Sequence, residues 1–455
     1  MSAVAKLLQD TGCAVSGSDE GFYPPVSDYL IENKIPFLEG YSASHIPADV
    51  DVIVIGKHAR LVPESNEEVA AAFVSGKQVS YPEVLSGLTK STTNYVVAGS
   101  FGKSTCTSLA ASVLLHSGKD PSFMVGALSP SLRENARLGS GGVFVLEGDE
   151  YPSANWDDTS KFIYFNTNHL LLTSCEHDHV NVFPTLPDYL KPFHQLVAQD
   201  PIKTITACVD GANVQDVLTS AKARVTSYSL HDTSADYYAQ GIQRSGAWVE
   251  FDLMRQGERM TPMRSRMLGE HNVQNVVGVG ALLLGTGLVT PVEFAAGIEA
   301  FLGVRRRLEL KTTSSRVPLY EDFGSSRAKL LAGIRAVRDQ FPDRKLYVVF
   351  EPHTFSFRNR GALAWYDDLF ADVDDVSVFA PPSHGAGTHD QLTQAEIVER
   401  IAATGRPVRA VDDKEQLRLA LEPIVDQNSV ILVETSGNIG GSVPYLTDWL
   451  ETAYA

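Results

Sequence analysis

The sequence predicts a three-domain α/β protein, because short apolar runs alternate with helix-like segments along most of its length. The chain has 455 residues, and domains of ~150 residues are typical, so about three domains are expected. The runs have the length and flanks of buried strands. Strand-like runs span 51–55, 95–98, 143–146, 169–172, 345–350 and 430–433, and helix-like segments include 104–116, 271–284, 328–340 and 394–403. This alternation indicates parallel sheets covered by helices.

Two joints divide the chain. A polar stretch at residues 89–94 precedes a strongly apolar run, which suits a linker. A helix-like segment ends in Gly303, and Arg305-Arg-Arg307 and a strand follow. We therefore expect domains over residues 1–92, 93–301 and 302–455.

The composition excludes several classes of protein. Hydrophobic residues make up 44% and charged residues 20%, as in ordinary soluble globular proteins. The net charge of −17 argues against a general nucleic-acid binder, which needs clustered Lys and Arg. No stretch approaches the ~20 apolar residues of a membrane span, and no basic-then-apolar signal segment begins the chain. The 4 cysteines have neither metal nor disulfide spacing, so a cytoplasmic location is expected.

A glycine-bearing loop follows the run at 95–98, with the sequence Gly99-Ser-Phe-Gly-Lys-Ser-Thr105 before a helix. Glycines let backbone N–H groups close around phosphate oxygens, and the helix N-terminus adds partial positive charge. Lys103 would reach the β- and γ-phosphates, and the Ser104 hydroxyl would bind Mg²⁺. Val97 stands where the general pattern has its first glycine, so a chance Gly-rich turn is the alternative. The strand–turn–helix context favours ATP binding.

Acidic and histidine side chains follow the next two apolar runs. Glu147-Gly-Asp-Glu150 comes first, and Glu147 is the metal candidate because Mg²⁺ takes oxygen ligands beside substrate phosphates. A solvated acidic loop is an equal alternative. Glu176-His-Asp-His179 comes second and fits a metal cluster, a pH-sensitive surface turn or an ordinary loop. Ends of sister strands in one parallel sheet would bring these groups to one crevice.

Five motifs in one order make the chain resemble the Mur ligases of bacterial cell-wall synthesis over essentially its whole length. They are residues 99–105, 147–151, 176–179, Leu268-Gly-Glu-His-Asn-Val-Gln-Asn275 and Phe301-Leu-Gly-Val-Arg-Arg-Arg307. Within the family the chain is most similar to the murein peptide ligases. That similarity lies in residues 18–30, 160–162, 178–179 with 183–184, and 436–441.

The resemblance implies a Rossmann-like domain over 1–92 for a UDP-sugar, a central P-loop ATPase-type domain over 93–301, and a C-terminal Rossmann-like domain over 302–455 for the amine or peptide acceptor. Family members begin with a strand and a Gly-rich turn ahead of residues like Met1-Ser-Ala. The first strand of the N-terminal domain is therefore expected to be missing here, either because the sequence is truncated or because the domain lacks that strand and binds the UDP diphosphate more weakly.

The resemblance also implies roles for individual residues, with ATP and Mg²⁺ as cofactors. Lys103, Glu147, His179 and Arg306 are the expected catalytic residues, and Ser104, Glu147 and His179 the expected metal ligands. The ATP-binding residues are expected to be Gly99, Ser100, Gly102, Lys103, Ser104, Thr105, His271, Asn272, Asn275, Arg306 and Asp322. Arg306, with Arg307 as a second choice, would reach the phosphates from the C-terminal domain.

The implied reaction joins the carboxylate of UDP-N-acetylmuramate to the amine of a murein tripeptide through an acyl phosphate, in cell-wall recycling. The alternatives are ligation of L-alanine to the same sugar, and a catalytically impaired protein that binds a nucleotide or UDP-sugar. Phe101 stands where relatives have His, and Ser325-Ser326 where they have a His-His pair. These departures motivate the impaired alternative. Arg358 fits either a contact to an acceptor carboxylate or a solvated surface position.

Overall fold

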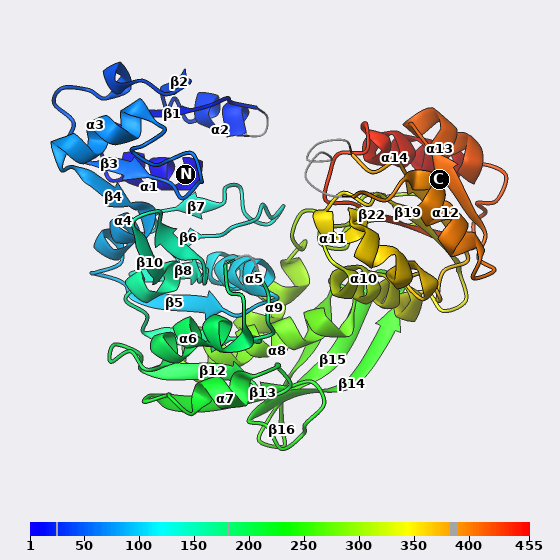
Figure 1. Ribbon diagram of the computed structural model, residues 1–455. Coiled ribbons are helices and arrows are strands. Elements are labelled where there is room, and N and C mark those ends of the chain that lie inside the picture. The colour runs from blue at the N-terminus through cyan, green and yellow to red at the C-terminus, as the bar shows by residue number, and fades with distance from the viewer. Residues whose placement is uncertain (24–25, 180–181, 383–389) are drawn as a thin grey trace. The chain divides into compact units, whose positions relative to one another are not determined.

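The computed structural model describes residues 1–23, 26–179, 182–382 and 390–455 (Figure 1). Contacts divide the chain into two compact units. Unit 1 comprises Met1–Gly241, Phe251–Arg264 and Gln274–Phe301, and unit 2 comprises Ile242–Glu250, Ser265–Val273 and Leu302–Ala455. Pro24 and Pro25, within the stretch 18–30 that resembles murein peptide ligases, lie outside the described residues. In the described ranges, no helix combines the length and apolarity needed to cross a bilayer.

The N-terminal part of unit 1 contains two separate two-stranded parallel sheets, β1–β2 and β3–β4. Helix α3 packs here through buried Val69 and Ala72, which join Ile55 of β3 in a small core. The side chain of Asn66 caps its start, and Gly76 ends it in the left-handed region at φ 67°. The elements are α1 (Ser2–Asp10), β1 (Gly17–Asp19), α2 (Val26–Glu32), β2 (Phe37–Glu39), β3 (Ile53–Ile55), α3 (Glu67–Ser75), β4 (Gln78–Ser80) and α4 (Tyr81–Leu88).

A ten-stranded sheet forms the centre, in the order β16-β15-β14-β13-β12-β11-β5-β8-β6-β7. Strands β13, β12, β11, β5, β8 and β6 run parallel. The strands are β5 (Thr93–Ala98), β6 (Ser122–Met124), β7 (Ala136–Arg137), β8 (Val143–Glu147), β11 (His169–Leu172), β12 (Thr204–Cys208), β13 (Arg224–Ser229), β14 (Tyr237–Ser245), β15 (Trp248–Arg255) and β16 (Glu258–Ser265). A separate pair, β9 (Pro152–Ala154) and β10 (Asp157–Ser160), is antiparallel.

Helices cover both faces of this sheet, which explains the continuous apolar runs at 95–98, 143–146 and 170–172 in its inner strands. On one face, Val96 and Ala98 of β5 share a core with Phe193 of α6. On the other face, α5 is almost wholly buried and packs on α9, where Gly297 lies against Val113. The helices are α5 (Lys103–His116), α6 (Leu186–Val197), α7 (Val214–Leu218), α8 (Glu270–Gly285) and α9 (Pro291–Ala300).

Unit 2 has a six-stranded sheet in the order β17-β18-β22-β19-β20-β21, parallel except for β17. Its strands are β17 (Glu309–Leu310), β18 (Leu319–Asp322), β19 (Lys345–Phe350), β20 (Asp375–Phe379), β21 (Val408–Val411) and β22 (Ser429–Glu434). Its helices are α10 (Arg327–Gln340), α11 (Phe355–Arg358), α12 (Gln394–Ala402), α13 (Lys414–Leu421) and α14 (Ser442–Ala453). The described residues also form the 3₁₀ helices η1 (Ala43–His45), η2 (Lys161–Tyr164) and η3 (Arg360–Asp367).

The α/β class and the parallel sheets covered by helices are confirmed, and the runs at 169–172 and 345–350 coincide with β11 and β19. The expectation of parallel sheets alone was incomplete, because β7 and β17 pair antiparallel to their neighbours. The residues from Tyr237 to Ser265 form three long strands that the strand-like runs did not include.

Candidate active site

The loop from Gly99 to Gly102 joins β5 to α5, and its two glycines have conformations that other residues rarely adopt. Gly99 has a φ of 136° and Gly102 a φ of 79°. A Cβ on Gly99 would overlap the Thr173 hydroxyl and lie 2.8 Å from the Ser174 carbonyl oxygen. This loop therefore turns tightly against the end of β11, and only glycine fits at its first position.

Hydrogen bonds hold the loop from the side of β11. The Ser100 amide donates to the Ser174 carbonyl at 2.8 Å, and its hydroxyl donates to the Glu176 carbonyl at 2.6 Å. The Thr173 hydroxyl donates to the Phe101 carbonyl at 2.6 Å. These contacts fix the path of the loop backbone.

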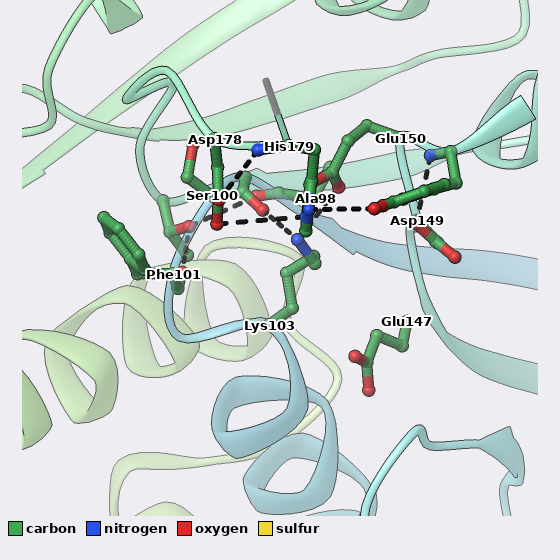
Figure 2. Close-up of polar contacts among 12 residues, drawn as sticks. Ala98, Ser100, Phe101, Lys103, Glu147, Asp149, Glu150, Asp178 and His179 are labelled. Atoms are coloured by element: carbon green, nitrogen blue, oxygen red, sulfur yellow. Dashed lines mark hydrogen bonds and ion pairs between the residues drawn. The ribbon is translucent and has the colours of Figure 1, made fainter. Parts of the chain in front are cut away.

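Lys103, the first residue of α5, forms a buried ion pair with Glu150. Its ammonium lies 2.9 Å from Glu150 Oε2 and donates to the Gly99 carbonyl at 2.5 Å. The ring Nε2 of His179 lies 3.2 Å from Glu150 Oε1, so Glu150 joins the two expected catalytic side chains (Figure 2). The Tyr151 hydroxyl and His179 Nδ1 are 3.1 Å apart. His179 has a φ of 56°, so a left-handed turn directs its ring toward this group.

The charges in this group depend on one another. Glu150 has no exposed surface, and burial alone would raise the pKa of its carboxyl. The His179 hydrogen bond and the Lys103 ammonium outweigh that effect and hold the pKa of Glu150 at about 2. Burial also opposes the charge on Lys103, yet Glu150 keeps the pKa of Lys103 above its ordinary value. The Lys103 ammonium is therefore a fixed positive charge beside the phosphate-loop backbone.

A second carboxylate, Glu147, stands apart from that group in Figure 2. Ser104 Oγ donates to Glu147 Oε1 at 2.8 Å, and the Gly126 amide donates to Oε2 at 2.7 Å. Despite both bonds, burial raises the pKa of Glu147 above its ordinary value. A carboxylate in this state would be stabilised by a cation beside Ser104.

These donors fit a magnesium ion shared with phosphates better than a metal held by protein alone. Within the described ranges, no three His, Cys, Asp or Glu side chains gather as such a metal site requires. Of the expected ligands, Ser104 and Glu147 lie together, whereas His179 contacts Glu150. Mg²⁺ commonly binds one or two protein oxygens and completes its shell with phosphates and water. Ser104 and Glu147 satisfy that requirement.

The residues expected on the adenine side of ATP are divided between the two units. Asn275 belongs to unit 1 and lies behind the loop, where a Cβ on Gly102 would lie 2.6 Å from its Oδ1. His271 and Asn272 belong to unit 2, and the side-chain amide of Asn272 donates to the Leu268 carbonyl at 2.7 Å. Thr105 lies in the first turn of α5. Within unit 1, Asn275 therefore lies beside the phosphate loop.

Arg306, in unit 2, is held by a loop of its own unit. Its Nη2 donates to the carbonyls of Thr435 and Gly437 at 2.8 and 2.7 Å, and its Nε lies 3.1 Å from Glu321. It also lies over the ring of Phe323, 5.2 Å from the ring centroid. These bonds fix the loop after β22 in its present path.

Asp322, also in unit 2, forms part of a buried carboxyl pair with Glu434. The two residues are register partners at the ends of β18 and β22. Asp322 Oδ1 accepts from the Leu308 amide at 3.0 Å, whereas neither Glu434 oxygen has a hydrogen-bond partner among the described residues. Burial and the neighbouring Asp322 raise the pKa of Glu434 well above its ordinary value.

The departures from the family pattern have structural explanations of differing kinds. Ser326 caps α10, because its side chain accepts from the Lys329 amide. The Ser325 hydroxyl lies 3.3 Å from the Lys329 ammonium. Arg358 is 5% exposed and donates to the Pro382 carbonyl, so it is not a solvated surface residue.

Sequence reasoning missed Glu150 as a site residue. It lies in the same acidic stretch as Glu147, three positions later, and follows the C-terminal end of β8. The available signal was a second Glu in the acidic stretch 147–150, in a chain whose phosphate loop carries a lysine that needs a carboxylate partner.

Comparison with known proteins decides the family. A model described as Mur ligase family, catalytic domain, matches residues 1–93, and one described as Mur ligase middle domain matches residues 97–283. The UDP-N-acetylmuramate–L-alanine ligase of Chlorobium luteolum is 30% identical over 429 residues, covering 92% of this chain and 87% of that protein. The chain belongs to the Mur ligase family.

Two solved structures resemble this Mur ligase. A UDP-N-acetylmuramate–alanine ligase from Thermotoga maritima aligns with a TM-score of 0.78 and 22% identity, covering 100% of this chain and 97% of that chain. A UDP-N-acetylmuramate:L-alanyl-γ-D-glutamyl-meso-diaminopimelate ligase from Neisseria meningitides aligns with a TM-score of 0.60 and 27% identity. The alignment covers 67% of this chain and 96% of that chain. The three-domain Mur ligase fold is confirmed, and the protein is an ATP-dependent ligase of peptidoglycan synthesis.

Proposed function

We propose that this ligase joins the carboxylate of UDP-N-acetylmuramate to the amine of L-alanine, while ATP is converted to ADP and phosphate. Curated relatives at 29% and 30% identity carry the name of that activity. These relatives favour L-alanine over the murein tripeptide that the sequence motifs suggested. The observation that carries the proposal is the loop in which Lys103 and Ser104 face two separate carboxylates, Glu150 and Glu147.

The chemistry follows from the low reactivity of a carboxylate toward an amine. A carboxylate oxygen of the sugar attacks the γ-phosphorus of ATP, ADP leaves, and an acyl phosphate forms. The amine then attacks the carbonyl carbon, and phosphate leaves with one former carboxylate oxygen. In the first step negative charge spreads over the transferring phosphoryl oxygens, which Lys103 is placed to stabilise.

Each loop residue has a task in this scheme. The backbone around Gly99 and Gly102 surrounds the phosphates, and Lys103 exchanges part of its contact with Glu150 for a phosphate oxygen. Glu150 keeps the lysine charged and aimed, and His179 keeps Glu150 ionised. When bound, Mg²⁺ would neutralise phosphate charge beside Ser104 and Glu147.

We propose the domain roles on the same basis. Residues 1–92 would bind the UDP-sugar, residues 93–301 ATP, and residues 302–455 the amine. Arg306 would contact the ATP phosphates, and His271, Asn272 and Asp322 would also serve the ATP side. A cytoplasmic location would supply both ATP and the nucleotide sugar.

A murein tripeptide is the second candidate acceptor, favoured by the 27% identity to the Neisseria ligase. The test supplies ATP, Mg²⁺, UDP-N-acetylmuramate and either L-alanine or the tripeptide, and measures phosphate release and product mass. We expect kcat/KM at least about tenfold higher with L-alanine, which is ~1.4 kcal/mol of discrimination. The reverse preference would assign the tripeptide. Binding of nucleotide without release with either acceptor would indicate an impaired ligase.

A further inference from the structure

A small polar cavity lies in unit 1, at the edge of the central sheet opposite the phosphate loop. Three of its residues, Thr204, Arg224 and Tyr237, begin β12, β13 and β14. The phosphate loop instead follows the C-terminal end of β5, which runs parallel to β12 through β11. The full lining is Thr204, Arg224, Thr226, Asp236, Tyr237, Arg255, Gln256 and Gly285. The cavity is therefore separate from the nucleotide site.

A buried hydroxyl without a partner marks this cavity. Tyr237 is 1% exposed, and its phenol oxygen hydrogen-bonds to nothing among the described residues. A Cβ on Gly285, which also lines the cavity, would lie 3.8 Å from that oxygen. Burial raises the pKa of Tyr237, so the phenol keeps its proton and is a hydrogen-bond donor. Buried donors are rarely left unpaired, so this hydroxyl calls for a bound acceptor.

The charges around the cavity favour an anion. The positive charges of Arg255 and Arg224 both lower the pKa of Tyr237, against the larger effect of burial. The Arg255 guanidinium lies over the Tyr237 ring, 5.5 Å from its centroid. One carboxylate, Asp236, opposes them. Its oxygens already accept from the Ser227 amide and hydroxyl, both at 2.8 Å, and from Gln256 at 3.2 Å. Two guanidinium groups against one occupied carboxylate leave a net positive site.

The volume limits the occupant. The cavity measures about 60 Å³, room for about two water molecules at ~30 Å³ each. One tetrahedral oxyanion, or one carboxylate group, is of comparable size, whereas a nucleotide is far larger. The hydroxyls of Thr204 and Thr226 add further polar lining, although Thr204 Oγ1 already pairs with His169 Nδ1 at 2.7 Å.

We propose that this cavity is a small-oxyanion site, in which the Tyr237 hydroxyl and the guanidinium groups of Arg224 and Arg255 bind inorganic phosphate or a carboxylate. Such a site lies outside the ATP and substrate positions proposed above. Since phosphate is a product of the proposed reaction, occupation would let the ligase respond to it at a distance from the catalytic loop.

The test measures binding of inorganic phosphate and, separately, acetate to the full-length protein by calorimetry. Five proteins are compared: wild type, Tyr237→Phe, Arg255→Gln, Arg259→Gln and Lys103→Ala. Arg259 is the matched control, because it is an exposed arginine paired with Asp252 and does not line the cavity. Lys103→Ala removes the cation of the phosphate loop and isolates the second site.

We expect phosphate binding that persists in Lys103→Ala, stays within about twofold of wild type in Arg259→Gln, and weakens about tenfold or more in Tyr237→Phe and Arg255→Gln. Acetate binding with the same variant pattern would assign a carboxylate as the ligand, and phosphate binding alone would assign phosphate. Two results would overturn the proposal. One is no binding of either anion at millimolar concentration, and the other is binding lost in Lys103→Ala but unchanged in Arg255→Gln. Because this test needs no turnover, it fails independently of the proposed ligase activity.

Discussion

Replacing Lys103 by methionine separates the structural and chemical tasks of the buried ion pair. Methionine keeps an unbranched stem but has no charge, so Glu150 loses its ammonium partner and keeps only the contact with His179. The pKa of Glu150 is held at about 2, against an ordinary value of 4.5. At ~1.4 kcal/mol per pKa unit, its interactions contribute about 3.5 kcal/mol at neutral pH. If Lys103 and His179 share this effect, Lys103→Met should cost about 2 kcal/mol of unfolding free energy.

The sign of the pH dependence follows from the lowered pKa. A carboxyl whose folded pKa is depressed contributes stability above its unfolded value of 4.5, and that contribution is lost as pH falls toward about 2. The difference between wild type and Lys103→Met should therefore be largest near neutral pH and shrink across this window. Urea unfolding followed by circular dichroism at several pH values measures it.

A second substitution distinguishes the two tasks. In Lys103→Met/Glu150→Gln the buried carboxylate is gone as well, so we expect most of the lost stability to return. Acceptor-dependent phosphate release should stay at least about 100-fold below wild type in both variants, because the phosphate contact is missing. Equal stability of wild type and Lys103→Met, or turnover that returns with stability in the double variant, would refute this reasoning.

Three further predictions concern other residues. Gly99→Ala should lower phosphate release about 100-fold or more, because its Cβ would overlap the Thr173 hydroxyl; near-normal turnover would contradict the tight turn. Glu147→Gln should raise the Mg²⁺ concentration for half-maximal rate about tenfold or more while leaving the melting temperature within a few degrees, and an unchanged Mg²⁺ requirement would remove Glu147 from the metal site. Glu434→Gln should gain stability relative to wild type as pH rises above 4.5, by up to ~1.4 kcal/mol per pH unit, because a raised folded pKa makes wild type lose stability in that direction. Parallel pH profiles in urea unfolding would show that Glu434 is ionised in the folded protein.

The phosphate loop could be predicted because its residues are restricted by local geometry. Only glycine fits the backbone at Gly99, and the motif itself names Lys103 and Ser104. The strands that end at the loop and at Glu147 were predicted for a related reason, since strands buried on both faces are apolar throughout.

The partners of the catalytic side chains could not be predicted from spacing. Glu147, Asp149 and Glu150 are close neighbours in sequence, and their order does not reveal which one is buried against Lys103. The direction of the His179 ring depends on its left-handed backbone, which brings it to Glu150 and away from Ser104 and Glu147.

The long strands between Tyr237 and Ser265 illustrate a signal that was present but unused. Gly246 and Gly257 both adopt positive φ, at 58° and 84°, between segments of alternating polarity. A glycine in such a turn is typical of a hairpin. The burial of Glu434 had no comparable signal, because an apolar run followed by Glu suits a solvated strand end equally well.

The most direct test of the central claim follows a carboxylate oxygen through the reaction. UDP-N-acetylmuramate labelled with ¹⁸O in its carboxylate is supplied with ATP, Mg²⁺ and L-alanine, and the released phosphate is analysed by mass spectrometry. The acyl-phosphate route predicts one ¹⁸O in each phosphate released by wild type and almost no release by Lys103→Met. Phosphate that carries no ¹⁸O would show that water accepts the phosphoryl group, and would contradict the ligase mechanism proposed for this loop.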